Sequence, residues 1–154
     1  MKYIKDFKGE QKRLEKIIAK MALGPHVAVG ILQDEKVDDK FSMVDLAIVH
    51  EYGSKNGHIP SRSFIRSTCD AKRQEHVKLM AKLQESVIVG KKTIGQALAT
   101  LGEVVSKDMV QTINRGIAPA NKPSTIKRKK KGSKPLVHTG NLKGAIQPEV
   151  RGAS

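Results

Sequence analysis

Apolar residues recur at helical spacing in three long segments of the chain. Residues 4–21 carry them at steps of three and four, with Lys and Glu on the opposite face, which predicts an amphipathic helix. A second helix is predicted over residues 63–90, with one apolar stripe formed by Ile65, Cys69, Val77, Met80, Leu83 and Val87. Thr93 and Gln96 match a capping box that opens a third helix over residues 93–116. Because few residues separate the last two helices, they should form an antiparallel hairpin.

Three shorter patterns complete the predicted core. Residues 42–52 begin with a capping box and are apolar nearly all round, so this helix should be buried or lie at a subunit contact. The sequence HVAVGIL at residues 26–32 is short, branched and apolar, which favours a strand. A final strand is predicted over residues 146–150, at a sheet edge, because Pro148 cannot donate to a ladder. The whole pattern predicts an α+β fold: a small antiparallel sheet packed with several helices, including a long helical hairpin.

The composition changes after residue 116. Residues 117–135 contain three prolines and no acidic residue, and their basic side chains are Lys122, Lys127, Arg128, Lys129, Lys130, Lys131 and Lys134. We expect a basic extended arm between a core of residues 1–116 and a C-terminal short helix and edge strand, residues 136–154, that complete this core. The arm contacts DNA phosphates or acidic protein, or it is a solvated segment. Without aromatic residues, any nucleic-acid contact would be to the backbone, without sequence readout.

The chain as a whole is strongly basic. Its 154 residues include 29 Lys and Arg against 15 Asp and Glu, a formal charge of +14, which predicts an acidic partner: nucleic acid or an acidic protein surface. The single cysteine, Cys69, excludes an internal disulfide, and its place on the apolar stripe predicts a buried structural thiol. No apolar run approaches the roughly 20 residues of a membrane span. We expect a soluble protein, made inside the cell, that does not contact a membrane.

Signatures of catalysis are missing from the sequence. It has neither a phosphate-cradling glycine loop nor a nucleophile elbow. His50 and Glu51 resemble the start of an HExxH zinc motif, but position 54 is Ser. A metal site built on His50, Glu51 and His58 is therefore a weak hypothesis. We expect no catalytic residue, no cofactor and no metal.

Two blocks of sequence carry a recognisable pattern. The first is AIVHEYG at residues 47–53, followed by IPSRSFIR at residues 59–66, and the second is PLVHTGNLK at residues 135–143. In this order they resemble the tail-completion or virion-morphogenesis proteins of tailed bacteriophages, a group that includes minor tail protein Z-like and neck components. Ser63 stands where that family often has proline, and Ala145 where it often has serine. These departures leave tail-completion, tail-terminator and neck roles open.

The resemblance implies a small α+β subunit without catalytic activity, which forms a hexameric or dodecameric ring at the head-proximal end of the tail and joins tail to head. Its partners would be other neck, connector and tail proteins, with genomic DNA in the lumen, and it would reside in the virion after assembly in the host cytoplasm. The residues that the blocks mark for assembly are His50, Glu51, Tyr52, Gly53, Pro60, Arg62, Phe64 and Arg66, and those marked for folding are Leu136, Thr139, Gly140 and Leu142. The alternative is a small basic nucleic-acid-binding protein, which explains the charge but neither block.

A charge pair is predicted inside the first block. Glu51 ends an apolar helix, where a carboxylate needs a partner, and Arg62 lies one loop away. We expect the two to pair, within a subunit or between neighbours, and so to hold the loop of residues 54–59; the alternative is two solvated charges. Pro60 fixes the chain ahead of the long helix, and Phe64 is the expected apolar anchor.

Overall fold

The computed structural model describes residues 7–22, 24–33, 36–37, 41–128, 136 and 141–152. Within them the order of elements is α1 (Phe7–Ala22), β1 (His26–Ile31), α2 (Met43–Tyr52), α3 (Ile65–Ile88), α4 (Ile94–Arg115), α5 (Pro123–Arg128), α6 (Asn141–Gly144) and β2 (Ile146–Arg151). The predicted α+β fold is confirmed: a two-stranded antiparallel sheet packs against helices, and α3 and α4 are in contact as a pair.

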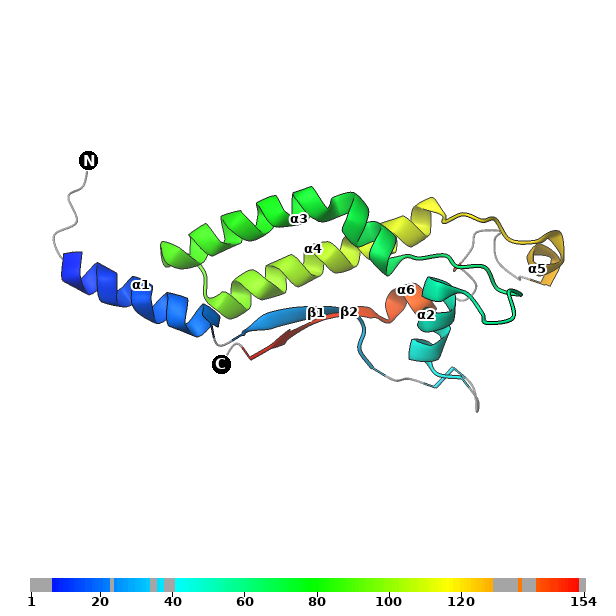
Figure 1. The fold of residues 1–154 in the computed structure, drawn as a ribbon, viewed down its shortest axis with the longest axis horizontal. Coiled ribbons are helices and arrows are strands. Elements are labelled where there is room, and N and C mark those ends of the chain that lie inside the picture. The colour runs from blue at the N-terminus through cyan, green and yellow to red at the C-terminus, as the bar shows by residue number, and fades with distance from the viewer. Residues whose placement is uncertain are drawn as a thin grey trace.

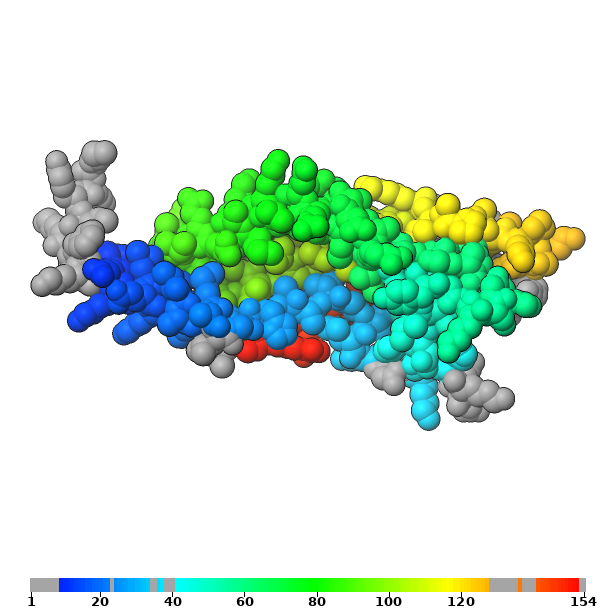
Figure 2. Space-filling model, in the orientation of Figure 1, coloured from blue at the N-terminus to red at the C-terminus, as the bar shows by residue number. Residues whose placement is uncertain are grey.

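The molecule is elongated, with α3 and α4 running side by side along its length and α4 lying between α3 and the sheet (Figure 1). At one end α1 extends beyond the sheet, and at the other α2 and α6 lie near the start of α3, with α5 farther out at the tip (Figure 1). In the space-filling view, atoms of α4 form the floor of a furrow between α3 and β1 (Figure 2). On this side of the hairpin, part of α4 is therefore not covered by another element (Figure 2).

The sheet is a simple antiparallel pair in which Val27 lies opposite Val150 and Val29 lies opposite Pro148. β2 has only one neighbouring strand, so it lies at a sheet edge, as predicted from the missing N–H group of Pro148. One face of the sheet packs on α4 at Gly102, where a Cβ atom would stand 2.7 Å from both Val27 Cγ2 and Pro148 Cβ. Glycine at this position lets the helix approach the two strands closely.

The hydrophobic core has two parts. Near α2 and α6, Phe64 is fully buried in a cluster with Met43, Ala47, Met109, Ile113, Leu136, Leu142 and Ile146. Farther along the hairpin, α3 and α4 pack through Leu83, Val87, Ala97 and Leu101. Phe64 is thus the anchor that the sequence predicted, and burying such a ring contributes about 2–3 kcal/mol. Both predicted capping boxes, at the starts of α2 and α4, are also confirmed.

The apolar stripe of α3 is only partly used inside the chain. Leu83 and Val87 are buried against α4, whereas Val77 is 57% exposed and Cys69 is exposed. The prediction of a buried Cys69 thiol is therefore wrong, because this side of the stripe is turned away from α4. Partial desolvation and the neighbouring Asp70 carboxylate raise the pKa of Cys69, so the thiol stays protonated and is a weak nucleophile.

Candidate functional site

Glu51, at the end of α2, caps the first turn of α3. Its side chain is buried, with 6% of the residue exposed. Oε2 accepts hydrogen bonds from the backbone N–H groups of Phe64 at 2.9 Å and Ile65 at 3.1 Å. Oε1 accepts from the N–H of Arg66 at 3.0 Å and from the hydroxyl of Ser63. The carboxylate therefore satisfies N–H groups that have no partner within the helix, and it sits at the positive end of the helix dipole.

These bonds also set the charge state of Glu51. Burial by itself would raise the pKa of this carboxyl. Hydrogen bonds from the Ser63 hydroxyl and from the N–H groups at the start of α3 outweigh burial and hold the pKa of Glu51 below its ordinary value. Glu51 is therefore a charged structural group, and the Ser63 hydroxyl is part of the cap.

The rest of the first block is tied to the end of α2. The Ser61 hydroxyl donates to the Glu51 carbonyl at 2.7 Å, and the Arg62 N–H donates to the His50 carbonyl at 2.7 Å. Gly53 has a φ of +84°, and a Cβ atom there would lie 3.0 Å from both the Ile59 carbonyl oxygen and the Ser61 nitrogen. Only glycine suits this turn without strain. The block thus folds as one unit that positions Arg62.

The Arg66 guanidinium lies 6.0 Å from the centre of the Tyr52 ring, a cation–π contact between α3 and α2. Tyr52 itself is 69% exposed. Both residues belong to the first block, and both stay on the surface of the folded chain. This makes them available for a contact outside the chain, in contrast with Glu51 and Phe64.

Arg62 turns away from Glu51. It is 7% exposed; its Nε donates to the Pro119 carbonyl at 2.8 Å, and its Nη2 donates to the Ala120 carbonyl at 3.2 Å. Among the ion pairs of the described residues none joins Glu51 to Arg62, so the predicted pair is not formed within the chain. The alternative of two solvated charges is wrong as well, because both side chains are buried. Burial lowers the pKa of Arg62.

The two sequence blocks meet around one open cavity of about 890 Å³. His50, Pro60 and Arg62 line it from the first block, and Leu136, Asn141 and Leu142 line it from the second. Lys122 and His58 add basic groups, and the remaining wall is mostly apolar, with Val37, Met43, Leu46, Ile59, Pro119 and Ala120. The structure therefore brings together residues that the sequence placed in separate segments. The carbonyl partners of Arg62 were missed because a backbone oxygen leaves no mark in the sequence.

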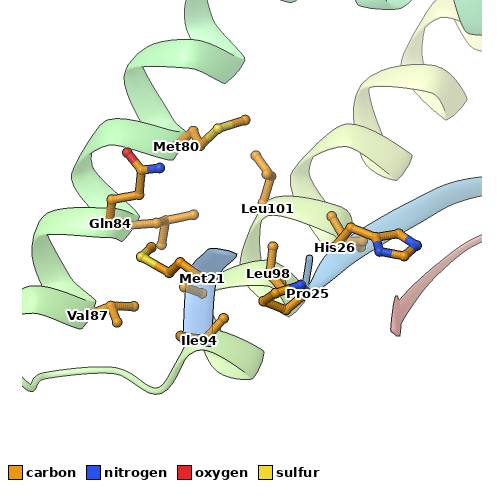
Figure 3. A pocket seen from close by; sticks show the side chains of 12 residues that line it. Met21, Pro25, His26, Met80, Gln84, Val87, Ile94, Leu98 and Leu101 are labelled. Atoms are coloured by element: carbon orange, nitrogen blue, oxygen red, sulfur yellow. The ribbon is translucent and has the colours of Figure 1, made fainter. Parts of the chain in front are cut away.

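A second hollow lies at the other end of the hairpin. It has a volume of about 370 Å³ and is lined by α1, β1, α3 and α4. Met80 of α3 and Leu98 and Leu101 of α4 converge on it, with Met21 of α1 closing one side (Figure 3). Ile18, on the same helix as Met21, is 64% exposed. No predicted site residue lies here; the breadth of the apolar stripes on the helices was the available signal.

His76 is a cross-link between the two long helices. Its Nε2 lies 2.8 Å from Oδ2 of Asp108, and both side chains are mostly shielded from solvent. Nearer the start of α3, the Thr68 hydroxyl donates to the Thr112 hydroxyl of α4 at 2.7 Å. These polar contacts fix how α3 lies against α4 and serve the fold, since neither pair lines any of the cavities described above.

The predicted basic arm is described only in part. Lys122 lies at the rim of the large cavity, and Lys127 is exposed on the short helix α5. The side chain of Arg128 and residues Lys129, Lys130, Lys131 and Lys134 lie outside the described residues, as do Thr139 and Gly140 of the second block.

Neither a metal-binding cluster nor a membrane-spanning helix occurs among the described residues. The described part of the chain contains no group of three or more His, Cys, Asp or Glu side chains that could hold a metal ion, and Glu51 of the hypothetical metal set is committed to α3. No helix within the described ranges is long and apolar enough to cross a membrane. The chain matches no protein-family model, and neither a curated protein nor a solved structure is significantly similar to it.

Proposed function

We propose that this chain is a structural protein of a phage virion at the head–tail joint, where copies assemble as a ring and join the tail to the head. The two sequence blocks that resemble tail-completion and neck proteins support this proposal. So does their meeting around one cavity, because the pattern then corresponds to a folded unit instead of scattered similarity. We assign the chain no enzymatic activity.

The observation that carries the proposal is the amount of apolar surface left uncovered. Large apolar side chains are exposed on four of the described helices, among them Ile18 on α1, Ile48 on α2 and Val77 on α3. Ile48 helps to line a hollow beside α2 together with Ile31 and Tyr52, and the larger apolar hollow of Figure 3 lies between α1, β1, α3 and α4. Exposed apolar side chains together with open apolar hollows are typical of surfaces that contact other protein chains. Contacts related by rotation close into a ring when the rotation closes.

The charge of the chain gives a further condition for assembly. Subunits of formal charge +14 repel one another, and a ring of them needs acidic protein or DNA phosphates to offset that field. DNA in the lumen or an acidic neighbouring ring meets this condition. Assembly should therefore depend on ionic strength.

Electron microscopy and mass photometry of the purified chain test this proposal, at about 50 mM and about 500 mM salt, with and without duplex DNA. We expect rings. Val77→Ser should shift the balance toward single subunits by at least about fivefold, since each contact loses apolar burial of about 1 kcal/mol. Ala71→Ser, on a different exposed face of α3, is the matched control. A chain that stays solitary under every condition would end the ring proposal.

The second candidate is a nucleic-acid-binding protein, favoured by one observation. Between Asp108 and Glu149 the sequence has no acidic residue, and it carries the whole basic run there. Such a stretch would bind phosphates in a salt-dependent way. A monomer that retards duplex DNA in a gel, without forming rings, would support this candidate over the head–tail role.

A further inference from the structure

We propose that the cavity around Arg62 binds a carboxylate carried on an apolar peptide segment of another protein. This inference names a partner chemistry for the cavity and rests on the proposed role in assembly. Its ligand is an Asp or Glu side chain flanked by apolar residues, as on an acidic neighbour at the joint.

The first ground is the environment of Arg62. Its guanidinium has five N–H donors, and the two bonds to the Pro119 and Ala120 carbonyls use two of them. Those carbonyls orient the group but do not neutralise it, and no ion pair among the described residues includes Arg62. A buried cation without an anion is costly. A carboxylate in the cavity would supply the missing charge through a bidentate or charge-assisted hydrogen bond.

The second ground is the charge of the described lining. Lys122 lies at the rim, held where its carbonyl accepts the N–H groups of Thr125 at 2.9 Å and Ile126 at 3.1 Å. His58 adds a ring whose Nδ1 lies 3.1 Å from the Asn56 carbonyl oxygen. No Asp or Glu is among the described residues that line the cavity. The site is therefore complementary to an anion.

The third ground decides which anion. Apart from its few cationic groups the wall is apolar, with Met43, Leu46, Pro60, Leu136 and Leu142. Every phosphate of a DNA duplex carries a charge. Binding one phosphate at Arg62 would therefore press the adjacent phosphates against the apolar wall and remove their water. A single carboxylate with apolar flanks matches a recessed guanidinium surrounded by apolar surface, as in a pocket with a few placed polar groups.

The test is an NMR titration of the full chain that follows the Arg62 Nε–H signal. The probe is the peptide acetyl-Leu-Glu-Leu-amide, and acetyl-Leu-Gln-Leu-amide is its neutral match; inorganic phosphate and a short DNA duplex are titrated separately. We expect the Glu peptide to shift the Arg62 signal and to bind at least about tenfold more tightly than the Gln peptide, because the Gln side chain carries no charge.

Matched variants locate the binding. Lys122→Gln should weaken the Glu peptide about two- to fivefold, as expected for an exposed charge, whereas Lys107→Gln, exposed on α4 away from the cavity, should leave it unchanged. Arg62→Lys, followed through the backbone amide signals of His58 and Lys122, should weaken it at least about tenfold, since lysine lacks the fork, and Arg66→Lys should not. If Arg62→Lys fails to fold, the Lys122 and Lys107 pair still decides.

Four results would overturn the proposal. They are no binding of the Glu peptide up to about 10 mM, equal binding of the two peptides, and a shift of Arg62 by phosphate or duplex but not by the peptide. The fourth is a shift of the Arg62 signal in Asp38→Asn/Asp39→Asn without any probe, which would assign the cavity to the chain's own acidic segment. Rings without peptide binding leave the head–tail role intact and end the carboxylate proposal. Peptide binding without rings supports the carboxylate site and ends the ring proposal.

Discussion

Replacing Glu51 by glutamine tests the cap that joins α2 to α3. In the folded chain its two oxygens accept three backbone N–H groups and the Ser63 hydroxyl. Glutamine keeps the size of the side chain but has one acceptor oxygen, and it presents N–H donors where the second oxygen was. At least two of the four bonds are therefore lost, and the negative charge at the helix N-terminus is lost with them.

The expected loss of stability follows from these bonds. A hydrogen bond to a charged group contributes about 1.5–3 kcal/mol, and N-caps are typically worth about 1 kcal/mol. Allowing for local relaxation, we expect Glu51→Gln to lower the free energy of unfolding by about 3 kcal/mol. For a chain of this length that corresponds to a fall in Tm of about 6–12 °C.

Circular dichroism melts across a pH series are the assay. Because the folded state holds the pKa of Glu51 below its ordinary value, its stabilisation is fully present above the unfolded pKa of about 4.3. That stabilisation disappears as the pH falls through the lowered folded-state pKa. The difference in Tm between the wild type and Glu51→Gln should therefore be full at pH 7 and shrink in acid.

Two results would refute this reasoning: a Tm within about 2 °C of the wild type at pH 7, or a difference that stays constant down to about pH 2. Glu103→Gln is the control, because Glu103 is exposed on α4. It should change the free energy of unfolding by no more than about 0.5 kcal/mol.

Three further predictions concern other contacts. Gly102→Ala should lower the free energy of unfolding by about 1–3 kcal/mol in urea titrations, because its Cβ meets Val27 and Pro148, while Gly144→Ala, with open space around it, should cost less than about 1 kcal/mol. Asp108→Ala removes the partner of His76 and should cost about 1 kcal/mol, with faster amide exchange along α3 and α4; unchanged exchange would speak against the cross-link. Replacing all five cations from Lys127 to Lys131 by Gln should weaken virion assembly or DNA retention in a salt-dependent way, and equal assembly at every ionic strength would remove this run from the mechanism.

Local rules account for the parts of the fold that the sequence predicted correctly. The capping boxes at Ser42 and Thr93 need only residues three positions apart, and the edge position of β2 needs only Pro148. Phe64 follows from its place among polar neighbours at a helix start. Such features depend on the chain nearby, so the sequence carries them directly.

The features that sequence reasoning missed depend on distant or featureless partners. The sequence predicts a charged partner for Glu51, whereas in the structure its carboxylate accepts mainly from backbone N–H groups, which every residue but proline carries. Arg62 bonds carbonyls at residues 119 and 120, far along the chain and without a side-chain signature. Cys69 belongs to a stripe wider than the contact that α4 makes with α3, so its exposure was set by packing.

The backbone carbonyls of His50 and Glu51 hold both ends of the loop that follows them close together. The residues between Gly53 and Arg62 begin and end on the same small cluster, with the Ser61 hydroxyl on the Glu51 carbonyl and the Arg62 amide on that of His50. A protease that cleaves at Asn56 or Gly57 would cut a loop whose two ends are hydrogen-bonded to each other. The two fragments should stay together as a noncovalent pair, which makes this turn a natural place to insert a tag or to permute the chain.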